Sequence, residues 1–109
     1  MDRALIWTER ASSDIEAIIR YIARRNPQAA SRIGYGIYDR VQILIQNPEA
    51  GTILDELREG GWRKLIFRRW KIVYALRGDR IIIGRVWPAA MGEADLDTPH
   101  PSLRARPCR

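Results

Sequence analysis

The residues best suited to do chemistry in this 109-residue chain are basic and lie close together. Residues 60–87 contain eight Lys or Arg residues against a single acid, Asp79, which gives this basic block a net charge of +7. Residues 1–59 carry a net charge of −1 and residues 88–109 are neutral, so the whole excess lies in the block. A positive field concentrated in this way attracts polyanions or an acidic protein. The alternative is a solvated face that only maintains solubility, although such a face normally mixes both signs.

Clustered cations permit one catalytic mode, which is stabilisation of a phosphorane-like transition state with a lysine moving the proton. This mode suits RNA cleavage, in which the 2′-hydroxyl is the nucleophile. If the chain is a nuclease, its catalytic residues are expected to be Lys64, Lys71, Arg77 and Arg85. Against this mode, the block has Asp79 as its only acid and no histidine.

Other classes of chemistry have few candidate residues. His100 is the only histidine and Cys108 the only cysteine, so metal sites, Ser-His-Asp triads and internal disulfides are not expected. The glycine patterns that bind nucleotide phosphates are missing. A cluster of acids in the connector, Asp55, Glu56 and Glu59, is better explained as solvated than as a catalytic pair. We therefore expect neither a metal nor a cofactor.

Binding of a macromolecule is the other use of the basic block. Aromatic side chains among cations can stack on bases or fill a protein interface. Trp70 and Tyr74 are assigned to the core, whereas Trp62 and Trp87 are left open between core and interface. The candidates for binding a target are Arg63, Lys64, Lys71, Arg77, Arg80 and Trp87.

Three strands are expected to position these side chains. Residues Trp62 to Phe67, Trp70 to Leu76 and Ile81 to Trp87 are rich in β-branched and aromatic types, which predicts an antiparallel meander. The first two strands are joined by Arg68-Arg69, and Gly78-Asp79 suits a type II′ hairpin between the last two.

The two-residue hairpin loop also predicts a register. It places Leu76 opposite Ile81, Tyr74 opposite Ile83, Ile72 opposite Arg85 and Trp70 opposite Trp87. We expect this mostly apolar face to pack on helices. The second face is then open, with Lys71, Arg77 and Arg80 on it. Ala75 and Gly84 should make it shallow enough for another backbone to approach.

Two helices are expected before the meander. Ser13 and Glu16 have the spacing of a capping box, and an apolar stripe follows at Ile15, Ile18, Ile19 and Ile22. Asn26-Pro27 ends the first helix and caps the second, whose stripe is Ala30, Ile33, Ile37, Val41 and Leu44. Asn47-Pro48 ends the second helix, and Gly34 and Gly36 within it suggest close approach of the two helices.

The remaining segments complete the expected organisation. Ala4 to Trp7 form a short apolar run that suits a buried strand, and Ile53 to Arg58 suit a helical turn in the connector 48–61. Residues 89–109 have little periodicity and are expected to be extended or disordered without a partner. No run is long enough to span a bilayer and no signal peptide is evident, so a cytoplasmic location is expected.

The order of several short motifs resembles the ParE/RelE superfamily of type II toxins over about residues 4–88. The motifs are Ile6-Trp7-Thr8, Ala11, Asp14-Ile15, Tyr21-Ile22, Asn26-Pro27, Ala29-Ala30, Asn47-Pro48-Glu49-Ala50-Gly51, Arg63-Lys64-Leu65, Ile72-Val73-Tyr74 and Ile83-Gly84-Arg85-Val86. The resemblance implies an α+β fold with an N-terminal strand and an antiparallel helical hairpin packed on a small antiparallel sheet that ends in the meander. Residues 1–88 would form this toxin domain and residues 89–109 its tail.

The resemblance also implies a small ParD-like antitoxin that binds the toxin as a hetero-oligomer, through residues that the sequence does not identify. RelE-like members cleave mRNA on the ribosome with basic residues of the sheet, and Lys64 and Lys71 match such positions. The basic, His or Tyr residues expected after the last strand are missing from Trp87-Pro88-Ala89-Ala90-Met91. This absence argues against a nuclease. ParE-like members of the superfamily are instead associated with poisoning of DNA gyrase. The leading interpretation is therefore a ParE-like, non-enzymatic inhibitor of DNA gyrase that supports plasmid stabilisation. The alternatives are a ribosome-dependent endonuclease and a non-toxic antitoxin-binding module.

Overall fold

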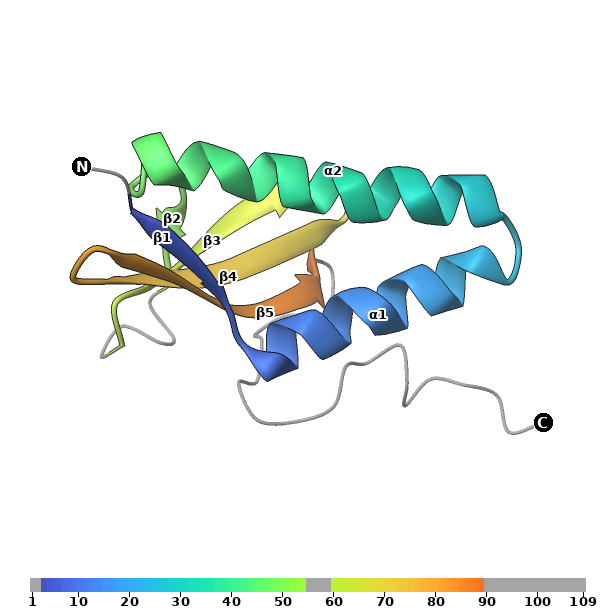
Figure 1. The fold of residues 1–109 in the computed structure, drawn as a ribbon, viewed down its shortest axis with the longest axis horizontal. Helices are drawn as coiled ribbons and strands as arrows, with labels where there is room; N and C mark the ends of the chain where they lie inside the picture. Colours follow the sequence, from blue (N-terminus) through green and yellow to red (C-terminus); the bar gives the residue numbers. More distant parts are fainter. Residues whose placement is uncertain (1–2, 55–59, 90–109) are drawn as a thin grey trace.

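Two helices cover one face of a five-stranded sheet in the computed structural model, which describes residues 3–54 and 60–89 (Figure 1). The strand order is β1-β5-β4-β3-β2, in which β1 pairs parallel to β5 and the other neighbours are antiparallel. The elements are β1 (Ala4–Trp7), α1 (Glu9–Ala23), α2 (Pro27–Gln46), β2 (Thr52–Ile53), β3 (Trp62–Phe67), β4 (Trp70–Arg77) and β5 (Arg80–Pro88). The predicted α+β fold with a helical hairpin on a small sheet is confirmed.

Helix α1 begins earlier than the sequence suggested. Its N-cap is Thr8, whose hydroxyl accepts a hydrogen bond from the Ala11 backbone N–H at 3.1 Å. The expected capping box at Ser13 and Glu16 is wrong, because both residues lie inside the helix. Thr8 follows β1 directly, so the chain turns from strand to helix without a longer connection.

The boundaries of α2 are those expected. The Asn26 side chain accepts from the Ala29 N–H at 3.0 Å, Pro27 occupies the first turn and Asn47 caps the other end. Gly34 lies against α1, since an added Cβ would meet Ile19 Cδ1 at 2.9 Å. The same expectation is wrong for Gly36, whose neighbour is the ring of Phe67 in β3.

Strands β1 and β2 form the two edges of the sheet and differ from the predictions. In β1, exposed Ala4 and Ile6 alternate with half-buried residues, so this strand is not fully buried. Ile53, expected to start a helical turn, lies in β2. Residues 55–58 of that expected turn lie outside the described part of the chain, as does the predicted tail beyond Ala89.

The meander forms as predicted, but its register is correct only near the hairpin loop. Leu76 pairs with Ile81 and Tyr74 with Ile83. A bulge at Gly84 then shifts the pairing, so that Val73 lies opposite Arg85. The pairings predicted for Ile72 with Arg85 and for Trp70 with Trp87 are therefore wrong.

The bulge changes which side chains of β5 face the helices. Ile72 pairs with Val86 and Lys71 pairs with Trp87, so Val86 joins the main core while Arg85 and Trp87 point to the opposite face. The buried main core lies between the helices and the sheet. It contains Ala11, Ile15, Ile18, Ile37, Val41, Leu44, Leu65, Trp70, Ile72, Tyr74, Ile81, Ile83 and Val86. Neither helix is long and apolar enough to cross a membrane among the residues described.

Candidate functional site

The candidate site lies on the far face, which we define as the sheet face turned away from the helices. This face was predicted to be open, and that prediction is wrong at its centre. Leu54, Val73 and Trp87 form a second, smaller buried cluster against which Trp62 packs. The space left by Gly84 is filled, because an added Cβ would meet the Trp62 ring at 2.7 Å. Ala75 is buried as well, so a second backbone cannot approach where we expected it.

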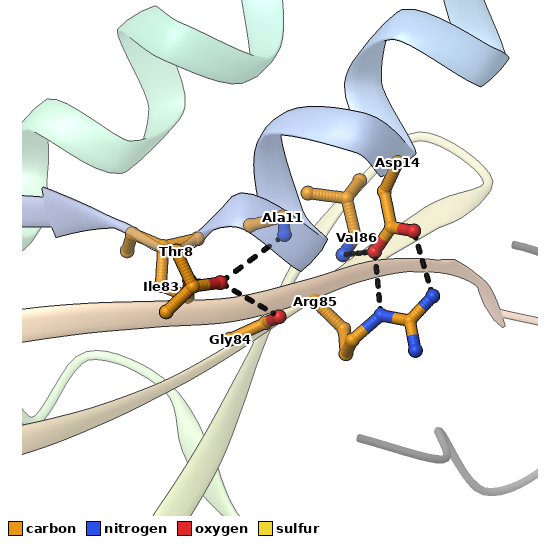
Figure 2. A network of polar contacts seen from close by, with 7 residues as sticks. All are labelled: Thr8, Ala11, Asp14, Ile83, Gly84, Arg85 and Val86. Atoms are coloured by element: carbon orange, nitrogen blue, oxygen red, sulfur yellow. Dashed lines mark hydrogen bonds and ion pairs between the residues drawn. The ribbon is translucent and has the colours of Figure 1, made fainter. Parts of the chain in front are cut away.

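The bulge in β5 is fixed by the start of α1 (Figure 2). The Thr8 hydroxyl lies 2.8 Å from the Ile83 carbonyl oxygen, to which it donates, and 3.2 Å from that of Gly84. Six residues after Thr8, an Asp14 carboxylate oxygen accepts from the Val86 backbone N–H at 2.9 Å. Strand β1 pairs with β5 only as far as Ile83, so side chains of α1 satisfy the backbone of β5 beyond that point.

Arg85 forms a buried ion pair with Asp14 (Figure 2). The guanidinium donates from Nε to Oδ2 and from Nη2 to Oδ1, both at 2.7 Å, and each side chain is 1% exposed. The guanidinium carbon also lies 4.7 Å from the centre of the Trp87 ring. A bidentate pair of this kind holds both charges in fixed positions. Arg85 therefore connects α1 to the far face, and its bidentate donors are directed at Asp14.

No structural role was predicted from the sequence for Thr8, and none for Asp14. Asp14 lies on the same helical stripe as Ala11, Ile15 and Ile18, all of which are buried. A carboxylate inside an apolar stripe requires a buried cation or several donors. This local signal predicts that a partner exists, but it does not identify Arg85 as that partner.

Two other candidate arginines hold the connector between α2 and β3. Arg63 pairs with Tyr74 on the helix-covered face and donates to the Gly51 carbonyl at 2.8 Å. Arg77 donates to the Gly60 carbonyl, and its guanidinium lies 5.6 Å from the centre of the Trp62 ring. Arg63 is thereby separated from the other candidates, whereas Arg77 lies at the exposed edge of the far face.

The remaining candidates occupy the far face at different depths. Lys64 is half-buried and pairs with Val73, whereas Lys71 is buried and pairs with Trp87. Arg80 is exposed beside the Gly78-Asp79 turn, in which only Gly78 has a positive φ, as a type II′ hairpin requires. The strand register therefore brings Lys64, Lys71, Arg77, Arg80 and Trp87 to one face.

Tyr74 is a core residue, as predicted. Its hydroxyl donates to the Pro48 carbonyl at 2.7 Å and accepts from the Gly51 N–H at 2.8 Å. Burial raises the pKa of the Tyr74 hydroxyl above its ordinary value of 10.0, because the phenolate would lose its hydration. The hydroxyl fixes the loop after α2 and faces away from the cations of the far face.

The chemistry available on the far face is that of a cationic surface with aromatic neighbours. No group of three His, Cys, Asp or Glu side chains that could hold a metal ion occurs in residues 3–54 and 60–89. Two groups able to exchange protons are engaged in hydrogen bonds, since Asp14 pairs with Arg85 and the Tyr74 hydroxyl holds the loop after α2. The arrangement is suited to binding an anionic or amphipathic surface.

Comparisons with known proteins agree with this fold. The protein-family model for the ParE toxin of the type II toxin–antitoxin system parDE matches residues 5–92 of this chain. A solved structure described as a chromosomal ParDE toxin–antitoxin system from P. aeruginosa is similar at 26% identity and a TM-score of 0.65, over 77% of this chain and 92% of that one. A search of curated proteins finds no match. Because the family model spans most of the sequence, the chain belongs to the ParE toxin family of type II toxin–antitoxin systems.

Proposed function

We propose that this protein acts as a toxin by inhibiting DNA gyrase without cleaving nucleic acid, and that a ParD-like antitoxin neutralises it. The observation that carries the proposal is membership of the ParE family across residues 5–92. A similar solved structure is described as a ParDE toxin–antitoxin system, which supports an antitoxin as the partner. ParE-like members of the superfamily are the ones associated with gyrase poisoning.

The side chains of the far face support a binding role. Of the residues named for a nuclease, Arg85 is bound to Asp14 and Arg77 to the Gly60 carbonyl. A nuclease also needs a group that takes and returns a proton near the cations. Asp14 and Tyr74 are committed to hydrogen bonds, and Asp79 lies in the exposed hairpin turn. We therefore assign the far face to target binding, with Lys64, Arg77 and Arg80 at its accessible positions.

DNA supercoiling by purified gyrase tests the proposed target. The refolded or antitoxin-stripped protein should inhibit supercoiling of relaxed plasmid in proportion to its concentration. Absence of inhibition at a large molar excess would remove gyrase as the target.

Two further measurements separate this proposal from its alternatives. Messenger RNA on translating ribosomes should stay intact in the presence of the toxin, and site-specific cleavage would favour the nuclease. Expression without the antitoxin should arrest growth, and normal growth at a verified protein level would favour a non-toxic antitoxin-binding module.

A further inference from the structure

The helical hairpin reaches past the ends of the strands on the side where α1 joins α2 (Figure 1). The end of β3 marks this limit, since Phe67 lies directly under Gly36 of α2. Inward-facing helical residues beyond that point lose the cover of the sheet. Ile22, Ala29 and Ile33 are consequently only half-buried, although Ile22 and Ile33 belong to the predicted core stripes.

A groove of about 650 Å³ lies under this overhang. One wall comes from the two helices and the other from the turn between β3 and β4. Its lining residues are Tyr21, Ile22, Ala29, Ile33, Arg68, Arg69 and Trp70. The floor is therefore apolar, and the rim carries the only charged residues among those that line the groove.

The charged residues that line the groove, and those in the link between the helices, are all arginines. Arg68 and Arg69 form one rim, and both are exposed. Arg24 and Arg25, also exposed, lie in the link between the helices at the same end (Figure 1). Among the described residues, Arg24, Arg25 and Arg69 form no ion pair. The turn that carries Arg69 is held in place, because the Ala89 N–H donates to the Arg69 carbonyl at 2.8 Å.

We propose that this groove docks an acidic amphipathic segment of a partner protein, whose apolar side chains enter the groove while its carboxylates meet Arg68 and Arg69. Apolar contact supplies the affinity, and the arginines select a partner of opposite charge. A second copy of this chain fits poorly, because it would bring the same four arginines together. Nucleic acid is disfavoured because the floor offers little stacking surface: Trp70 is only 6% exposed, which leaves Tyr21 as its one accessible aromatic ring. Identification of the segment with the antitoxin rests on the proposed function, but the chemistry of the groove does not.

Binding of designed peptides to the full-length protein tests the proposal. The probe is a labelled helical peptide of about 16 residues with Leu at i, i+3, i+4 and i+7 and Glu elsewhere. Two controls have the same Leu pattern with Lys in place of Glu, and the same composition with the Leu pattern scrambled. We expect saturable binding of the probe and at least tenfold weaker binding of both controls, measured by fluorescence anisotropy.

Charge reversal on the protein then locates the site. Arg68→Glu/Arg69→Glu should weaken binding by about tenfold, because two attractions become repulsions. Arg10→Glu/Arg32→Glu makes the same change in net charge with exposed residues that do not line the groove, and should change affinity less than twofold. Amide NMR shifts on addition of the probe should centre on Ile22, Ala29 and Ile33.

Four results would overturn the proposal. They are equal losses in the two charge-reversed variants, NMR shifts confined to the far face, tighter binding of the Lys peptide, and self-association that Arg68→Glu/Arg69→Glu abolishes. The gyrase assay is independent of these measurements. Loss of groove binding with supercoiling still inhibited would reject only the groove, whereas groove binding without inhibition would reject only gyrase as the target.

Discussion

The two faces of the sheet are built in different ways from the same three strands. The helix-covered face is a continuous apolar core, in which alternating side chains of β4 and β5 pack against the apolar stripes of the two helices. The far face has a small cluster of Leu54, Val73 and Trp87, and it buries two cations, Lys71 and Arg85. The first face forms the main core, whereas the second has its accessible cations at Lys64, Arg77 and Arg80. The bulge at Gly84 contributes to this difference, because it turns Arg85 and Trp87 away from the helices.

The largest expected effect comes from breaking the ion pair that joins the two faces. Asp14→Ala leaves the Arg85 guanidinium buried without its carboxylate and removes the acceptor of the Val86 N–H. The free energy of unfolding should fall by about 3–5 kcal/mol. Urea denaturation monitored by circular dichroism measures this change.

A double variant tests whether the unpaired charge causes the loss of stability in Asp14→Ala. Asp14→Leu/Arg85→Met should be less destabilised than Asp14→Ala, because it leaves no unpaired charge. A double variant as unstable as the sum of its single changes would mean that the two residues act separately.

The next prediction compares how strongly packing on each of the two faces stabilises the fold. Ile72 is fully buried in the main core, and Ile72→Ala should cost about 2–5 kcal/mol of unfolding free energy. Leu54 is 7% exposed and belongs to the smaller cluster of the far face, so Leu54→Ala should cost about 1–2 kcal/mol. Equal losses in urea denaturation would mean that the far-face cluster supports the fold as strongly as the main core.

Tyr74 offers a test of the helix-covered face through pH. Tyr74→Phe leaves the Pro48 carbonyl and the Gly51 N–H without their partner, which should cost about 1–2 kcal/mol near neutral pH. Because burial raises the pKa of Tyr74, the folded state holds this proton more tightly than the unfolded state. The stability from this residue should be fully present below pH about 10 and decrease as the pH rises further. The Phe variant should lack that part of the decrease, and parallel pH profiles would contradict the account.

The smallest effect concerns the turn that forms the rim of the groove. Arg68 adopts a φ of 55°, which favours glycine. Arg68→Gly relieves this strain but loses a cation–π contact with Phe67 and increases the freedom of the unfolded chain. The net change in unfolding free energy should be stabilising by less than about 1 kcal/mol. Thermal denaturation should show a small rise in Tm, and a decrease would mean that the contact with Phe67 outweighs the strain.

The sequence predicts the parts of the structure that depend on local rules better than those that depend on contacts between distant residues. Helix boundaries at Asn26 and Asn47, the hairpin at Gly78 and the helix-facing alternation up to Ile83 depend on local rules, and all were predicted correctly. The bulge at Gly84 depends on Thr8 and Asp14, which are some seventy residues away in the chain. No local period reveals such a contact, so the pairings beyond Ile83 were predicted wrongly.

Of the candidate residues, Lys71, Arg77 and Arg80 were predicted to share the far face, but the burial of each candidate was not predicted. The register does bring Lys64, Lys71, Arg77, Arg80 and Trp87 to one face. Burial of Lys71, Arg85 and Trp87 could not be foreseen, because it depends on the bulge and on Leu54 and Trp62 folding over the strands. The groove under the helical hairpin was also missed, since it arises from the greater length of the helices relative to the strands.

The most direct test of the central claim is gyrase inhibition by variants of the far face. Lys64→Glu/Arg80→Glu reverses two accessible far-face charges, whereas Arg10→Glu/Arg32→Glu makes the same change in net charge on the helices. If the far face contacts the target, the first variant should need at least about tenfold more protein to inhibit supercoiling, and the second should match the unmodified toxin. Unchanged inhibition by a folded Lys64→Glu/Arg80→Glu variant would contradict the account.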